Sequence, residues 1–213
     1  MAELARTLAH RTLDAVLREV TAAAVELIPG VDTAGILYVK KSGQFDSVAG
    51  TSDLPHRLDE LQMKFDEGPC LHAAVADTIV RTSDFRSEAR WPQYSPAAVE
   101  LGVRSGLSFK LYTSDRTAGA LNLFGFQPRE WDADAESVGS VLAAHAAAAV
   151  IAAQQEEQLQ AALLTRDRIG QAKGIIMERY GVDDVRAFQM LRQLSQESNT
   201  KLTDVAQLVI QSR

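Results

Sequence analysis

Cysteine is almost absent from this sequence of 213 residues, which contains a single one, Cys70. One cysteine excludes an internal disulfide framework and a multi-cysteine zinc site, and it cannot supply both an attacking and a resolving thiol. The four histidines are scattered without an HExxH or similar spacing: His10, His56, His72 and His145. We therefore expect no metal site and no identifiable cofactor.

Long apolar runs and the usual catalytic motifs are also missing. No run approaches the roughly 20 apolar residues that a membrane span needs, and the N-terminal segment MAELARTLAHRTL is interrupted by charge. The sequence contains no GxSxG, no P-loop and no cysteine–histidine pair in an established context. We predict a cytoplasmic protein that has no membrane partner and is not an enzyme.

Proline is absent between residue 132 and Tyr180, and this gap predicts one long helix. Asp132 or Asp134 can cap its start, and its length would be roughly 70 Å at about 1.5 Å per residue. Residues spaced alternately by three and four form a seam along it: Val138, Val141, His145, Ala148, Ala152, Gln155, Leu159, Ala162, Arg166 and Ile169.

This seam favours a parallel homodimer, with residues 132–165 as a connecting helix that forms a coiled coil. Two other interpretations explain the same segment. The helix could be an alanine-rich linker that lies along its own domain, or it could break near the polar QQEEQ run.

The formal net charge of -6 is unevenly distributed along the chain. Residues 1–154 carry 14 Lys+Arg against 20 Asp+Glu, whereas residues 165–213 carry 8 against 6. An acidic front part and a weakly basic tail indicate two units, the second of which suits an anionic partner.

The front part, residues 1–150, has the pattern of an α+β domain. A helical stripe in LDAVLREVTAAAVELIPG ends at Pro29-Gly30. Pairs of β-rich runs flank the polar segments Lys41–Gln44 and Thr113–Arg116. A strand is expected at 78–84, and helices at 55–63, 69–76 and 91–102. Local hairpins with intervening helices favour an antiparallel sheet with flanking helices.

The tail, residues 160–213, has the pattern of an all-α, three-helix domain. Tyr180-Gly181 marks the end of its first helix, Asp183 or Asp184 can cap the second, and Thr200 can cap the third. We assign four residues to its core: Phe188, Leu191, Val205 and Ala206. So short a unit buries little surface, so we expect it to depend on the long helix and on dimerisation for its stability.

The tail segments RIGQAKGIIMERYG and AFQMLRQLSQESNTKLTDVAQLVI strongly resemble the ANTAR domain, a three-helix RNA-binding module of bacterial antitermination regulators. In the front part, GILYV, FDEGPCLHAAV, SGLSFKLY and GALNLFGF resemble a GAF domain in their order across about residues 10–150. Together they resemble a GAF–ANTAR transcription antitermination regulator.

This resemblance implies a GAF sensor domain and a dimer whose ANTAR domains bind RNA. The RNA would be a pair of stem-loops with six-nucleotide loops in an mRNA leader, stabilised against a competing terminator. Physically, such binding needs cations for the phosphates and side chains that stack on, or hydrogen-bond to, exposed loop bases.

On this resemblance, Lys173 is the first candidate for a phosphate contact, and the small Ala172 and Gly174 would let RNA approach the helix backbone. A second edge near the last turn and further positions on the first helix complete the predicted RNA-binding set: Arg192, Ser195, Asn199, Lys201, Arg166, Arg168 and Gln171. A solvated lysine beside a helix-packing glycine, and an asparagine that only forms a turn, remain open alternatives.

In the front domain, Cys70 follows Gly68-Pro69 at the start of a predicted helix, where the helix dipole favours a thiolate. A redox-sensing or ligand-touching thiol is one interpretation, and a small buried hydrophobe is the other. Four aromatic residues could line a cavity for an unknown small ligand, although ordinary core packing explains the same spacings: Phe65, Trp91, Phe109 and Phe124.

Two other functions fit parts of the sequence. LTDVAQLVI could begin a DNA-binding helix-turn-helix, but a recognition helix should follow it, and the sequence reaches Arg213 first. No DNA partner is therefore expected. A dimeric protein-interaction adaptor, in which the long helix and the tail bind other proteins, is the third interpretation.

Overall fold

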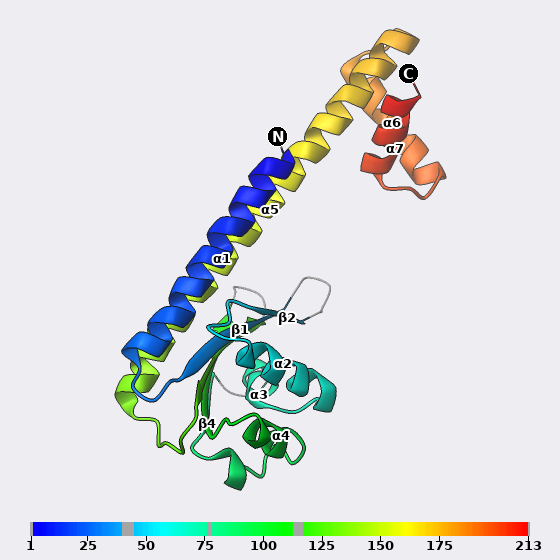
Figure 1. Cartoon of the computed structure of the whole chain (residues 1–213). Helices are drawn as coiled ribbons and strands as arrows, with labels where there is room; N and C mark the ends of the chain where they lie inside the picture. The colour runs from blue at the N-terminus through cyan, green and yellow to red at the C-terminus, as the bar shows by residue number, and fades with distance from the viewer. Residues whose placement is uncertain (1, 40–44, 76–77, 113–116, 213) are drawn as a thin grey trace. The chain divides into compact units, whose positions relative to one another are not determined.

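This computed structural model describes residues 2–39, 45–75, 78–112 and 117–212. The chain divides into two units, Glu3–Gln154 and Gln155–Arg213. One helix, α5 (Ala133–Tyr180), contributes its first part to one unit and the remainder to the other (Figure 1). The turns predicted at Lys41–Gln44 and Thr113–Arg116 lie outside the described residues.

The first unit is built on a five-stranded antiparallel sheet in the order β2-β1-β5-β4-β3. Its strands are β1 (Thr33–Val39), β2 (Phe45–Val48), β3 (Ile79–Thr82), β4 (Ser105–Tyr112) and β5 (Thr117–Gly125). Sequence neighbours β1 and β2, and likewise β4 and β5, pair directly. The predicted antiparallel sheet with flanking helices is confirmed.

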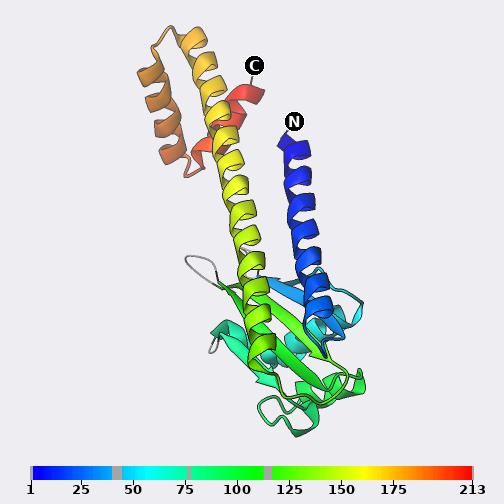
Figure 2. The same cartoon turned by 90° about the vertical axis from the view of Figure 1, so that its left-hand side faces the viewer.

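Helices cover both faces of this sheet (Figures 1 and 2). Residues of α1 (Ala2–Leu27) and of the first part of α5 share one core with one face. The other face is covered by α2 (Leu54–Phe65), α3 (Pro69–Val75) and α4 (Tyr94–Glu100). These match the helices expected from the sequence, whereas the short 3₁₀ turn η1 (Phe85–Ser87) is not predicted.

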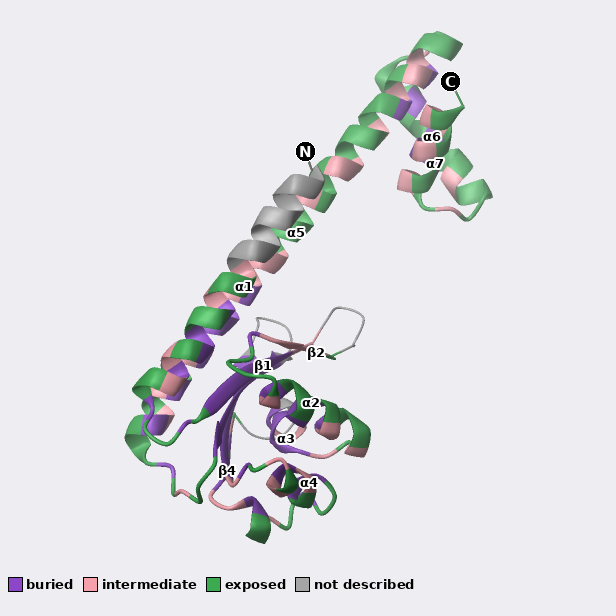
Figure 3. Cartoon of the chain, viewed as in Figure 1, coloured by how far each residue is buried: buried purple, intermediate pink, exposed green. Residues whose placement is uncertain are grey.

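Side chains of β5 alternate between the two cores, as the period of a strand requires. Leu121 and Leu123 face the core shared with α1 and α5, whereas Phe124 faces the core under α4. Asn122, between the two leucines, lies on the α2 side and is 1% exposed. The described residues of the central strands β1, β4 and β5 are mostly buried, whereas the edge strand β2 is half-buried to exposed (Figure 3). The sheet therefore fixes the positions of side chains on both sides of it.

Helix α5 is unbroken over 48 residues, so the long helix is confirmed and the alternative of a break near QQEEQ is excluded. The backbone N–H of Ala135 donates to the Asp132 carboxylate at 2.8 Å, which confirms this residue as the cap. In the first unit, one side of α5 packs on the sheet through Ala143, Ala146 and Val150. This part of the helix does lie along its own domain.

The apolar character of α5 exceeds what the sequence analysis recognised. An 18-residue window of it has a mean hydropathy of 1.5 and is 33% buried, and α5 is thus long and apolar enough to cross a membrane. Length and composition alone do not distinguish a span from a helix that packs on a sheet, as α5 does here.

The middle of the predicted seam, from Val141 to Leu159, faces away from the residues that pack on the sheet, whereas Val138 and Ile169 at its ends pack against the cores of the two units. Val141 is 69% exposed and Leu159 is 63% exposed, and the intervening seam positions His145, Ala148, Ala152 and Gln155 are exposed as well. The middle of the seam is therefore a surface stripe of this chain.

The second unit packs the end of α5 against α6 (Asp184–Glu197) and α7 (Leu202–Gln211). Helix α5 ends before Gly181, whose φ of +64° is the left-handed conformation that glycine favours. Asp183 caps α6, accepting the backbone N–H of Arg186 at 2.8 Å. The predicted cap of α7 is wrong, because the Thr200 hydroxyl donates to the Ser198 carbonyl and no side chain caps that helix.

The core of the second unit contains six buried residues: Ala172, Ile176, Ala187, Leu191, Val205 and Ala206. Leu191, Val205 and Ala206 thus lie where the sequence analysis placed them. The assignment of Phe188 to this core is wrong, because its side chain is 39% exposed.

Candidate nucleic-acid interface

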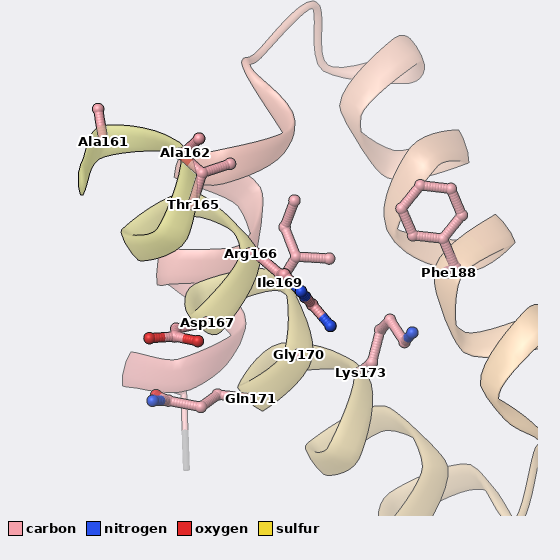
Figure 4. Close-up of a pocket in the computed structure, with 10 residues that line it drawn as sticks. All are labelled: Ala161, Ala162, Thr165, Arg166, Asp167, Ile169, Gly170, Gln171, Lys173 and Phe188. Carbon is pink, nitrogen blue, oxygen red and sulfur yellow. The ribbon is translucent and has the colours of Figure 1, made fainter. Parts of the chain in front are cut away.

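A hollow of ≈ 790 Å³ lies over the second part of α5 and is bordered by Phe188 of α6. We call it the α5 groove. Its other lining residues all belong to α5: Ala161, Ala162, Thr165, Arg166, Asp167, Ile169, Gly170, Gln171 and Lys173. Figure 4 shows Arg166, Ile169 and Lys173 on the side of α5 that faces Phe188, and Asp167 and Gln171 on the other side.

Lys173 lies at the end of this groove and is held by an ion pair. Its Nζ is 2.5 Å from the Asp184 carboxylate on α6. The lysine side chain is 22% exposed and that of Asp184 is 64% exposed. An ion pair this open to water stabilises the fold little, so an incoming anion can compete with Asp184 for the lysine. The sequence motif around Lys173 gave no indication of this partner.

Two further cations lie along the same region. Arg166 is two helical turns before Lys173 on the same side of α5, and it is exposed. Arg192 is one turn after Phe188 on α6 and is also exposed. Within the described part of the chain, neither arginine forms an ion pair. Their charges are available to an anionic partner.

Two candidates on α5 do not lie beside Lys173. At about 100° per residue, Arg168 and Gln171 lie about 140° and 160° around the helix from Lys173. Both are exposed. Although Gln171 lines the far edge of the groove, the structure does not bring these two side chains together with Lys173.

The two small neighbours of Lys173 differ in their surroundings. Ala172 is fully buried in the three-helix core, so its predicted role beside RNA is wrong. Gly174 is exposed, and an added Cβ would have no atom within 4 Å of it among the described residues. Close helix packing inside this chain therefore does not explain the glycine.

The remaining candidates lie at the turn between α6 and α7. Asn199 has a φ of +50°, so it forms the left-handed turn that the alternative interpretation expects, and its side chain is exposed. The Ser195 hydroxyl donates to the Thr200 carbonyl at 2.6 Å, which commits it to this turn rather than to a ligand. Lys201 is exposed at the start of α7.

In the first unit, Cys70 is 1% exposed and packs with Leu37 and Ala120. Burial, together with the nearby charge of Asp59, raises the pKa of its thiol. The interpretation as a thiolate favoured by the helix dipole does not fit this site, because burial disfavours the charged form of the thiol. The small buried hydrophobe is the interpretation that the structure supports.

A polar network that the sequence analysis missed lies next to Cys70. The Ser47 hydroxyl donates to the Asp59 carboxylate at 2.6 Å, and the Gln62 amide donates to it at 3.1 Å. The Gln62 carbonyl oxygen accepts the backbone N–H of Cys70 at 2.8 Å, and Asn122 lies 3.4 Å from Asp59. This network joins β2, α2, α3 and β5.

Burial raises the pKa of Asp59 to about 7, although the hydrogen bonds from Ser47 and Gln62 and the nearby His56 act to lower it. The carboxylate is 3% exposed. The sequence does contain a sign of the network: the polar Ser108 and Asn122 occupy core-facing positions of otherwise apolar strands.

The four aromatic candidates do not line one cavity. Phe109 lies in the core on the α5 side of the sheet, so its predicted place in a shared ligand cavity is wrong. Trp91 and Phe124 are buried in the core under α4, with Phe65 at its edge. A different hollow of ≈ 470 Å³ lies between β2 and α2 and reaches Asp59. A small ligand remains a prediction for this unit.

Within the described ranges, no three histidine, cysteine or carboxylate side chains form a group that could hold a metal ion.

Sequence models of two known families match the chain. A GAF domain model matches residues 10–150, and an ANTAR domain model matches residues 157–210. The chain belongs to the GAF domain family. Its GAF domain is followed by an ANTAR domain, which is the GAF–ANTAR architecture. The α5 groove and the three-helix core lie within the ANTAR domain, and the Asp59 network lies within the GAF domain.

Solved structures similar to this chain support the GAF fold. A photoproduct-state GAF domain from Synechocystis has a TM-score of 0.56 at 15% identity and covers 70% of this chain and 99% of its own. A GAF domain of a phosphoenolpyruvate-protein phosphotransferase from Coxiella burnetii has a TM-score of 0.55 at 17% identity. It covers 68% of this chain and 86% of its own. No curated protein matches the chain.

A third similar structure is an enzyme, the type II free methionine-R-sulfoxide reductase from Thermoplasma acidophilum. Its TM-score is 0.53 at 15% identity, and it covers 67% of this chain and 94% of its own. Likeness at this identity shows the fold alone. The GAF and ANTAR domains are a sensor and an RNA-binding regulatory domain, and neither is a catalytic domain as such.

Proposed function

We propose that this protein is a cytoplasmic, dimeric transcription antiterminator whose ANTAR domains bind paired RNA stem-loops. The RNA would be a pair of six-nucleotide loops on stems in an mRNA leader, and binding would prevent the terminator from forming. A signal sensed by the GAF domain would regulate this activity. The match of an ANTAR domain to residues 157–210 is the observation that carries the proposal.

The surface chemistry of the ANTAR domain supports an RNA partner. Arg166, Lys173 and Arg192 place positive charge along one side of α5 and α6. Phosphate contacts of this kind give affinity without reading sequence. The exposed bases of a loop can be read by side chains, whereas the deep major groove of a regular RNA duplex admits none. A looped RNA therefore suits this surface better than a continuous duplex.

Binding to a two-hexaloop RNA, compared with a DNA duplex of equal charge, tests the RNA proposal. We expect the full-length protein to bind the RNA more tightly and with an affinity that falls as salt rises, because counterions are released from the phosphates. Fluorescence anisotropy over a salt series measures both quantities. Equal affinity for the two nucleic acids, or no RNA binding, would contradict the proposal.

The exposed seam of α5 supports the dimer. Val141 and Leu159 are 69% and 63% exposed, and a second copy of α5 would bury them by knobs-into-holes packing. We expect sedimentation equilibrium to give the mass of two chains, and Leu159→Asp to shift the protein toward one chain. The exposed Leu208 on α7 offers a matched control, since Leu208→Asp lies off the seam. A wild-type protein of single-chain mass at micromolar concentration would overturn the dimer.

A further inference from the structure

We propose that the α5 groove is a nucleobase subsite, in which one unpaired base of the bound RNA stacks on the ring of Phe188. This inference rests on the proposed function and deepens it, because it names the part of the RNA that the groove takes. It also gives Phe188 a role that core packing would not.

The exposure of Phe188 sets it apart from its neighbours on α6. Ala187 and Leu191 are fully buried in the three-helix core, whereas Phe188 is 39% exposed and turns its ring toward the groove (Figure 4). An exposed aromatic ring is a platform on which any base can stack, because every base has a π-face. Stacking would remove apolar surface of the ring from water.

The opposite wall of the groove is low. Gly170 lines it, and an added Cβ at that position would meet no atom within 4 Å among the described residues. Ala162, about two turns earlier on α5, also has a small side chain and lines the groove. A planar ring entering beside Phe188 therefore finds open space at Gly170, with the side chains of Arg166, Ile169 and Lys173 around it (Figure 4).

Charge favours a nucleotide over an apolar peptide side chain as the occupant. Arg166 and Lys173 line the same groove as Phe188, so a base on the ring would bring its own phosphates next to cations. The Asp184 carboxylate already occupies Lys173 at 2.5 Å. A phosphate would take the place of that carboxylate, and the ion pair thus keeps Lys173 oriented toward the groove until RNA binds.

A second copy of α5 is the competing occupant, because the exposed seam continues through Ala162 and Arg166 into the groove. Such a dimer contact would leave Phe188 covered by protein. The two occupants differ in what a change at Phe188 does: loss of a base contact weakens RNA binding, whereas loss of a dimer contact changes the mass.

The test uses the full-length protein and a two-hexaloop RNA that carries 2-aminopurine at one loop position at a time. We expect wild-type protein to quench the probe at one loop position, and Phe188→Ala to remove the quenching and weaken binding roughly 5- to 150-fold, as the loss of one stacked base does. Phe188→Tyr keeps a ring and should restore both. Leu208→Ala, an exposed apolar side chain outside the groove, is the control.

An RNA that lacks the base at the quenched position separates the subsite from a general loss. It should bind wild-type protein as weakly as intact RNA binds the Phe188→Ala protein, and the two changes together should cost no more than either alone. If the Phe188→Ala protein binds RNA as tightly as the wild-type protein does, the subsite is overturned, whereas the proposed function still stands. An altered mass in Phe188→Ala assigns the ring to the dimer instead, and the absence of RNA binding by wild-type protein overturns the proposed function itself.

Discussion

The two domains of this chain differ in which kind of side chain breaks the usual rule of burial: an ionisable side chain is buried in one, and an aromatic side chain is exposed in the other. In the GAF domain, the ionisable side chain of Asp59 is 3% exposed and is held by hydrogen bonds among core residues. In the ANTAR domain, the apolar ring of Phe188 is 39% exposed beside a lysine. A buried carboxylate affects the free energy of folding, whereas an exposed ring is available to a partner. Substitutions should therefore act on stability in the first domain and on binding in the second.

The largest effect on stability is expected from the buried carboxylate. Burial raises the pKa of Asp59 from 3.8 to about 7. The folded state therefore binds a proton that the unfolded state has already released between these two values. The stability that Asp59 contributes is fully present below about pH 4 and is lost as pH rises toward about 7, and a shift of this size corresponds to a few kcal/mol.

Asp59→Asn removes this titration while keeping a side chain of the same shape. We expect wild-type stability to fall relative to the variant as pH rises from about 4 to about 7, with no further change above that range. Urea unfolding at a series of pH values measures the difference between the two proteins. If the unfolding free energies of the two proteins differ by the same amount at every pH in this range, Asp59 does not titrate there.

Two glycines of α5 sharpen the comparison between the domains. Gly139 is buried, and a Cβ there would lie 2.2 Å from Phe109 Cζ, in a core that leaves the ring 2% exposed. Gly139→Ala should destabilise the protein by about 1–3 kcal/mol through overpacking. Gly174→Ala meets open space and should stabilise the helix by up to about 1 kcal/mol, the usual difference between the two residues.

For RNA affinity, the variant that keeps its stability, Gly174→Ala, should be the impaired one, and the destabilised Gly139→Ala should be the unaffected one. We expect Gly174→Ala to weaken RNA binding, because its methyl group would stand where the proposed interface brings the RNA backbone close to α5. Gly139→Ala should leave the affinity of the folded protein unchanged. Thermal unfolding and RNA titration on both proteins measure this. Full RNA affinity in a stabilised Gly174→Ala protein would place Gly174 outside the interface.

The fold follows from local patterns that the sequence displays clearly. Hairpin segments gave the antiparallel sheet, the proline-free stretch gave α5, and Asp132 and Asp183 cap the helices that they precede. The predicted Thr200 cap of α7 was wrong because the residues of the turn hydrogen-bond to one another: the Ser195 hydroxyl donates to the Thr200 carbonyl. Such competition depends on the left-handed backbone at Asn199, which the turn-forming interpretation of this asparagine allowed but which the cap prediction did not take into account.

The candidate site was only partly predictable, because a motif does not show which way each side chain faces. Ala172 and Lys173 are adjacent, yet one is fully buried and the other lines the groove. Phe188 shares the helical spacing of Leu191, so periodicity placed it in the core. The small core between the end of α5 and the short helices α6 and α7 does not cover its ring. Asp59 has the sequence context of a residue on a surface helix. Its burial depends on the tertiary structure, which brings Ser47 of β2 within hydrogen-bonding distance of its carboxylate.

The central claim, that RNA phosphates meet the side of α5 that carries Lys173, is tested most directly by the salt dependence of RNA binding in Lys173→Ala. The matched control is Arg168→Ala, which removes an exposed cation about 140° around the same helix. We expect Lys173→Ala to bind more weakly, with a slope of log affinity against log salt that is shallower by about one, and with unchanged helical content and mass. Equal affinity and slope in Lys173→Ala and wild-type protein, or the same loss in Arg168→Ala, would contradict the account.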